Sequence, residues 1–188
     1  MLYIGSTAKS GTHYTTEFLN RLGVKVQHEY PGLDGIVTWY THHTPAIYPN
    51  ELKTDVENSI CLHQTREPLA TISSLMKLDD ESWRYIRRAM QMDLSRPLLK
   101  RCMEYYYYWH LQLEDCTFQY QVEEITELID ILDLFDVKYD RSKIDWALET
   151  PRLGSTPDKK WLTWKDLLYA NPDLYVDIRE MGRSYGYN

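Results

Sequence analysis

Short apolar runs alternate along the chain with segments of helical periodicity. Four runs predict strands: Leu2–Ile4, the alternating residues 24–27, and residues 59–64 and 117–121. Apolar positions recur at helical spacing over 12–22, 68–76, 81–92, 97–113 and 123–135, and a last helical region covers 161–187. Strands that alternate with helices favour parallel pairing through right-handed crossovers. The pattern therefore predicts an α/β layer structure.

The segment between the second and third predicted strands, residues 28–45, is rich in residues that interrupt regular structure. It contains Pro31, Gly32 and Gly35. We therefore expect a loop followed by a short helix there.

Length and hydrophobicity place the chain among ordinary globular proteins. Its 188 residues suit one domain over 1–188, and we find no internal repeat or linker. No apolar run approaches the roughly 18 residues that a membrane span requires. The N-terminal sequence has neither the basic region nor the long apolar region of a signal peptide, so we expect a cytoplasmic protein.

The three cysteines, Cys61, Cys102 and Cys116, are odd in number and show no CxxC spacing. This pattern favours buried reduced thiols over a disulfide framework, and it does not indicate a metal site. The aromatic run 105–110 lies within a predicted helix, so its rings point in several directions. We expect this run to lie mostly in the core. The alternative interpretation is that one or two of its rings line a ligand pocket.

The net charge of −7 argues against general nucleic-acid binding, because proteins that bind nucleic acids usually carry an excess of Lys and Arg. It does not exclude a small anionic ligand held by a few well-placed cations. The chemistry of such a site begins at the first predicted strand.

The stretch GSTAKSGTHY, Gly5 to Tyr14, links that strand to the first helix. Gly11 allows the backbone to approach an anion, and the N–H groups at the helix start are unpaired donors. Lys9 adds a cation, and the hydroxyls of Ser10 and Thr12 add donors. The loop therefore fits a phosphate or a sulfate, although a capped helix start with an exposed lysine remains the alternative. It is not a Walker A loop, since Lys9 precedes the glycine instead of following it.

A second polar element, TREPLATISS, follows the third predicted strand. Arg66 stands at the strand end, and Ser74 comes eight residues later on the next helix. Arginine offers a two-pronged donor to phosphate, and a helical serine can donate from another direction. This element thus adds a second candidate anion site.

Together these stretches resemble the motifs of sulfotransferases. KSGTHY is similar to their 5'-phosphosulfate loop of K-S-G-T-T-W type, and Arg66 with Ser74 matches their 3'-phosphate motif. VKVQHE, TFQYQVEEI and the C-terminal segment also resemble parts of bacterial members. The resemblance implies a three-layer, P-loop-like parallel sheet flanked by helices. It also implies the donor 3'-phosphoadenosine-5'-phosphosulfate (PAPS) and no metal.

The resemblance implies a role for each matching residue. Lys9 would neutralise charge as 3'-phosphoadenosine-5'-phosphate (PAP) leaves, and Arg66 and Ser74 would bind the 3'-phosphate. Tyr14 stands where cytosolic members have the tryptophan that stacks on adenine. The other loop contacts would come from Ser10, Gly11, Thr12 and His13.

The family also carries a late loop of R-K-G type. Here PRLGSTPDKK supplies Arg152 as a further ligand for the 3'-phosphate, but Leu153 replaces the lysine of that pattern.

Sulfuryl transfer needs a base that takes the proton of the acceptor. Glu29 is our candidate, because it follows the second predicted strand and so lies at the same sheet edge as the loop. His28, His42 and His43 are the rivals, since cytosolic members use a histidine. A solvated loop carboxylate is the alternative interpretation of Glu29.

The sequence thus predicts transfer of a sulfuryl group from PAPS to a hydroxyl or amine of a small molecule, carbohydrate or peptide. A P-loop kinase is one alternative, but the third predicted strand ends in Gln-Thr-Arg and not in the aspartate that helps to hold magnesium. A non-catalytic nucleotide-binding or interaction module with the same fold is the other. The sequence does not indicate an oligomeric state.

Overall fold

The computed structural model describes residues 1–40, 59–151 and 161–188. The chain divides into two compact units. The first contains Met1–Thr65 and Leu113–Ser155, and the second contains Arg66–Gln112 and Thr156–Asn188. We describe each unit by itself. The single domain expected over 1–188 stays a prediction.

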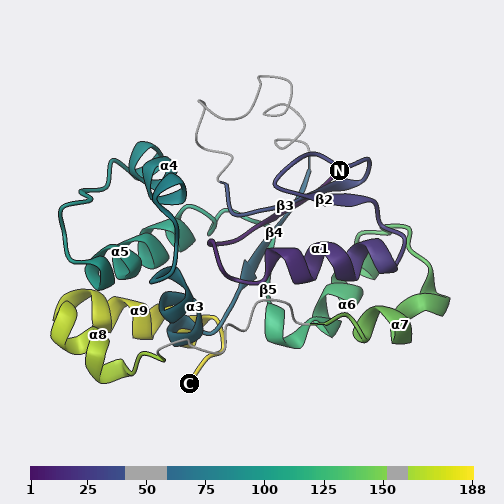
Figure 1. Cartoon of the computed structure of the whole chain (residues 1–188). Coiled ribbons are helices and arrows are strands. Elements are labelled where there is room, and N and C mark those ends of the chain that lie inside the picture. Colours follow the sequence, from purple (N-terminus) through teal and green to yellow (C-terminus); the bar gives the residue numbers. More distant parts are fainter. Residues whose placement is uncertain (41–58, 152–160) are drawn as a thin grey trace. The chain divides into compact units, whose positions relative to one another are not determined.

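The first unit is built on a five-stranded sheet in the order β2-β3-β1-β4-β5 (Figure 1). Its strands are β1 (Leu2–Gly5), β2 (Val26–His28), β3 (Gly35–Thr38), β4 (Ile60–Thr65) and β5 (Phe118–Gln121). Every neighbouring pair is parallel, and Gly5 at the end of β1 stands beside Thr38 and His63. The predicted α/β fold with a parallel sheet and flanking helices is therefore confirmed. Because parallel strands end at one edge, the segments that follow them start from that edge.

The third strand corrects a prediction. Residues 28–45 were expected to form a loop and a short helix, but Gly35–Thr38 is β3, paired between β2 and β1. Ile36 and Val37 are fully buried there. A side chain at Gly35 would place its Cβ 2.1 Å from the carbonyl oxygen of Leu2, so only glycine permits this approach of the two strands. Residues 41–45 of the segment lie outside the described residues.

One face of the sheet is covered by α1 (Thr12–Arg21), α6 (Thr126–Leu134) and α7 (Ile144–Leu148) (Figure 1). Leu2 and Ile4 of β1 belong to this core, whereas Tyr3 between them packs with Ile36 on the other face. Full burial of each large apolar side chain contributes roughly 2 kcal/mol. Short 3-10 turns, η1 (Val122–Glu124) and η2 (Arg141–Lys143), precede α6 and α7.

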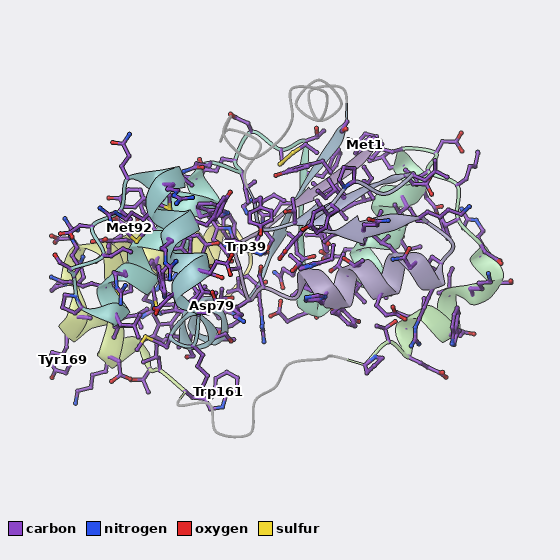
Figure 2. All side chains as sticks on the ribbon, turned by 45° about the horizontal axis from the view of Figure 1, so that its top comes forward. Met1, Trp39, Asp79, Met92, Trp161 and Tyr169 are labelled. Atoms are coloured by element: carbon purple, nitrogen blue, oxygen red, sulfur yellow. A yellow bond between two sulfur atoms is a disulfide. The ribbon has the colours of Figure 1, made fainter. Side chains whose placement is uncertain are left out.

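The second unit is helical. It comprises α3 (Pro68–Leu75), α4 (Asp80–Met90), α5 (Leu98–Leu111), α8 (Trp164–Ala170) and α9 (Pro172–Ser184). Side-chain caps set several helix starts: Glu67 accepts from the first N–H groups of α3, and Asp79, labelled in Figure 2, accepts from Ser82 at the start of α4. Such caps contribute about 1 kcal/mol each.

The aromatic run of α5 lies mostly in the core, as predicted. Tyr105, Tyr106 and Trp109 are fully buried, whereas Tyr108 is about half exposed. Its buried rings therefore stabilise the helical unit.

The cysteine prediction is wrong for two of the three residues. Cys61 and Cys116 form a disulfide, with their Cα atoms 4.8 Å apart, while Cys102 is a free buried thiol. The pairing follows from the sheet, since the carbonyl of Cys61 in β4 accepts from Thr117 N–H just before β5. Spacing rules could not reveal a bond across 55 residues.

Among the described residues, no helix combines the length and the apolar character that a membrane crossing needs.

The buried His63 of β4 predicts how stability depends on pH. Its side chain is almost completely buried, and this burial lowers its pKa from 6.5 to about 4. Between those two pH values the unfolded chain binds a proton that the folded chain does not, so stability falls as the pH drops. The shift amounts to roughly 3 kcal/mol, fully lost below about pH 4.

Urea unfolding of the wild type and of His63→Gln at several pH values measures this effect. The variant should lose less stability than the wild type between about pH 6.5 and pH 4. Val176→Ala, at an exposed position of α9 without a titratable side chain, is the control and should keep the wild-type slope. An unchanged slope in His63→Gln would contradict the assignment.

Candidate functional site

The loop between β1 and α1 has an unusual backbone. Lys9 has φ of 66° and Gly11 has φ of 91°, both in the left-handed region. Gly11 occupies the N-cap position of α1 and makes no side-chain capping bond. The first N–H groups of α1 therefore lack a cap from that residue, which is the arrangement that favours an anion at a helix start.

The serines of the loop hold its own backbone. Ser10 is completely buried, and its hydroxyl donates to the carbonyl of Thr7 and contacts the hydroxyl of Ser6. Ser6 in turn donates to the backbone carbonyl of Gln64 at 2.8 Å. The Ser10 side chain, expected to donate to a ligand, thus stabilises the loop, and its backbone N–H is the group that remains as a candidate ligand contact.

Gln64 of β4 is a buried polar residue that the sequence reasoning overlooked. Its Nε2 donates to the carbonyl of Ser10 at 2.8 Å, and its Oε1 accepts from Thr15 at 2.5 Å and from Tyr120 at 2.7 Å. A polar amide near the end of an otherwise apolar strand segment, ICLHQT, is the signal that could have drawn attention to it. A buried amide is stable only when it is hydrogen-bonded.

The other predicted loop residues differ in exposure. Lys9 and His13 are exposed and so accessible to a ligand, and Thr12 is buried. Tyr14 is only 7% exposed and packs in the apolar core between the sheet and the helices α1, α6 and α7. Its expected stacking on adenine stays a prediction, and its ring already has an extensive structural role.

His28 and Glu29 lie together at the end of β2. The Nε2 of His28 is 2.8 Å from the hydroxyl of Thr12 at the start of α1. The ring of His28 also stacks on the ring of His13, with their centroids 3.7 Å apart. The Nδ1 of His28 is 3.6 Å from Oε1 of Glu29. Both predicted proton acceptors are therefore connected to the loop.

Two donors fix the carboxylate of Glu29. The indole N–H of Trp39, labelled in Figure 2, donates to its Oε1, and the hydroxyl of Tyr40 donates to Oε2 at 3.5 Å. Glu29 itself has φ of 64°, and its N–H donates to the carbonyl of Val37 in β3. The missed strand β3 thus supplies the framework that orients Glu29.

His28 is neutral at neutral pH. Burial lowers its pKa from 6.5 to about 4; the Glu29 carboxylate acts in the opposite direction, and His13 lowers it further. The imidazole can therefore accept a proton, and its contact with Glu29 is not an ion pair at neutral pH. At neutral pH His28 therefore provides no positive charge beside the Glu29 carboxylate.

Arg66 and Ser74 belong to the second unit. Arg66 follows β4 in the chain and precedes Glu67, the N-cap of α3. The hydroxyl of Ser74 donates to the carbonyl of Ala70 at 2.8 Å and is partly accessible, whereas the neighbouring Ser73 is buried and accepts from Leu162 N–H. Of the two serines, Ser74 is thus the more accessible.

Some candidates fall outside the described residues, namely Arg152, His42 and His43. Within the residues that are described, no group of three or more His, Cys, Asp or Glu side chains could hold a metal ion.

Gly11 provides a test of the loop, because both its backbone and its space are restricted. An added Cβ would meet Val122 Cγ2 at 3.1 Å, and φ of 91° is unfavourable for any other residue. Gly23 has nearly the same φ, 90°, but nothing lies within 4 Å of its added Cβ. An alanine at Gly23 therefore reports the cost of the left-handed backbone alone, whereas an alanine at Gly11 reports that cost together with the steric contact to Val122.

Gly11→Ala should lower the free energy of unfolding by more than Gly23→Ala, measured by urea titration. Gly23→Ala should lose about 1 kcal/mol from backbone strain alone, and Gly11→Ala should lose roughly 1 kcal/mol more. Equal losses in the two variants would mean that the loop yields to the extra methyl group.

Comparisons with known proteins give a distant result. No family model and no curated protein matches the chain. Among solved structures, the chain is similar to a mouse sulfotransferase in complex with PAP, at 14% sequence identity and a TM-score of 0.48. The match covers 97% of this chain and 88% of the other. The function is therefore inferred from the residues of this chain.

Proposed function

We propose that the chain is a sulfotransferase that moves a sulfuryl group from PAPS to a hydroxyl or amine of a small molecule, carbohydrate or peptide. The observation that carries this proposal is the loop at the end of β1. It combines an exposed lysine in a left-handed conformation, an N-cap without a side chain, and a carboxylate and a neutral imidazole nearby. The KSGTHY and REPLATISS motifs support the same reading.

The donor would be held by its anionic groups. In this proposal the backbone N–H groups from Ser10 to His13 bind the 5'-phosphosulfate, and the Lys9 ammonium neutralises the leaving phosphate. Arg66 and Ser74 bind the 3'-phosphate, with Arg152 as a further cation. No metal is needed, because positioning and fixed charges can stabilise a transfer of this type.

Glu29 would take the proton of the acceptor. As the acceptor oxygen or nitrogen forms its bond to sulfur, the bond from sulfur to the bridging oxygen breaks and PAP leaves with that electron pair. The proton of the acceptor passes to Glu29, whose carboxylate Trp39 and Tyr40 hold in place. The neutral His28 leaves the charge of Glu29 available and is the alternative base.

Calorimetric titration with PAP, 5'-AMP and magnesium-ATP tests the proposal. We expect binding that depends on the 3'-phosphate and is independent of magnesium. Arg66→Ala should weaken PAP binding at least tenfold, about 1.4 kcal/mol, and leave 5'-AMP binding unchanged. Arg84→Ala, at an exposed arginine of α4, is the matched control and should bind like the wild type.

Two outcomes would contradict it in different ways. A preference for magnesium-ATP would make the chain a kinase-like protein. PAP binding without transfer to any of a panel of phenols, amines, sugars and tyrosine peptides would make it a non-catalytic module.

Glu29→Gln should reduce the transfer rate by at least 100-fold, within the usual range for loss of a general base, and leave PAP affinity unchanged. The amide is close in shape to the carboxylate and can still accept from Trp39. Glu17→Gln, at an exposed glutamate of α1, is the control. A retained rate in Glu29→Gln together with a lost rate in His28→Asn would assign the base to His28.

A further inference from the structure

The loop depends on a buried residue from another strand. Gln64 is completely buried in β4, and its side-chain amide bonds to three partners from three different segments: the carbonyl of Ser10 and the hydroxyls of Thr15 and Tyr120. Its backbone carbonyl accepts from a fourth residue, Ser6. One residue thus connects the loop, α1 and β5.

The orientation of the Gln64 amide is determined by its partners. The carbonyl of Ser10 can only accept, so the group that faces it must be the Nε2 donor. Burial raises the pKa of Tyr120, which keeps its hydroxyl protonated and able to donate to Oε1. A flipped amide would place Oε1 against the carbonyl oxygen of Ser10, two acceptors in contact.

This bond sets the direction of the next peptide group. A trans peptide is planar, so the N–H of Gly11 points opposite to the carbonyl of Ser10. Because Gln64 Nε2 holds that carbonyl in the protein interior, the N–H of Gly11 points away from Gln64. Ser10 also lies between the two residues with positive φ, Lys9 and Gly11, so the bond acts where the backbone is least favourable.

We propose that Gln64 is a positioning residue. Through the carbonyl of Ser10 it holds the loop in the conformation that directs the N–H of Gly11 and the backbone of Lys9 toward an anion. The effect on ligand binding rests on the proposed function, whereas the effect on the loop does not.

Two variants change the bond to Ser10. Gln64→Leu removes all three side-chain bonds at similar volume. Gln64→Glu keeps an acceptor for Thr15 and Tyr120 and can donate to the carbonyl of Ser10 only while it is protonated. A protonated carboxyl therefore restores the bond, and an ionised one opposes it.

Two controls change the other side of the network. Tyr120→Phe and Thr15→Val each remove one hydroxyl donor and leave the bond to Ser10 in place. They report what general loss of packing or hydrogen bonding does to the loop.

Two readouts are measured on each full-length variant: amide hydrogen exchange of the peptide that covers residues 5–14 without ligand, and PAP affinity by calorimetry. In Gln64→Leu, we expect the amides of residues 5–14 to exchange roughly tenfold faster than in the wild type. We expect its affinity for PAP to be roughly tenfold weaker. In the two controls, loop exchange and PAP affinity should each stay within about twofold of the wild type once the loss of global stability is taken into account. In Gln64→Glu, protection of the loop should decrease as the pH rises.

If residues 5–14 exchange in Gln64→Leu as in the wild type, the inference is overturned. It is also overturned if loop exchange in all variants, the two controls included, simply follows the loss of global stability. Loop protection in Gln64→Glu that does not vary with pH would also overturn it, and this variant decides the question if Gln64→Leu does not fold. If the wild type does not bind PAP, the proposed function fails, while the exchange comparison still tests Gln64.

Discussion

The parallel register of the sheet is the constraint on which the first unit depends. Because β1 pairs with both β3 and β4 in the same direction, the ends of these strands meet at one edge. Lys9, Glu29 and Gln64 are far apart in sequence, yet Lys9 and Glu29 follow β1 and β2, and Gln64 is the last residue but one of β4. The pairing therefore places the three segments that carry this cation, this carboxylate and this buried amide at one edge of the sheet.

Backbone strain coincides with this edge. Within the described ranges, four residues other than glycine have positive φ, and Lys9 and Glu29 are two of them. Such conformations cost about 1–2 kcal/mol each and persist when the surroundings hold them. Gln64 and the buried serines hold the loop of Lys9, and β3 with Trp39 holds Glu29. Strain at two candidate residues, each held by hydrogen bonds from neighbouring segments, favours a site prepared before a ligand arrives.

The elements with clear periodicity could be predicted from the sequence. The strands at 2–4 and 59–64 and the helix from Thr12 were found because they have continuous apolar runs or one apolar face. β3 was missed because Gly35 and the nearby Pro31 and Gly32 indicate a turn, whereas the close approach to Leu2 is what requires a glycine. Local patterns could not represent that tertiary contact.

The residues of the candidate site also divide into those that local sequence patterns indicate and those that depend on tertiary contacts. Lys9, Glu29 and His28 could be proposed from the sequence because their residue types, their positions after predicted strands and the family resemblance all indicate such roles. Gln64 and the disulfide of Cys61 with Cys116 were missed because both depend on partners that only the sheet brings close. The pKa of His28 was equally inaccessible, since burial by tertiary packing is its largest cause.

The most direct measurement of the central claim is an NMR titration of the protein with PAP, observed through its backbone amides. If the loop after β1 holds the 5' group of the nucleotide, the amide signals of Ser10 to His13 should move first and furthest, with a common saturation curve. Saturable shifts confined to other segments, or unchanged loop signals in a folded protein at high PAP concentration, would contradict the account.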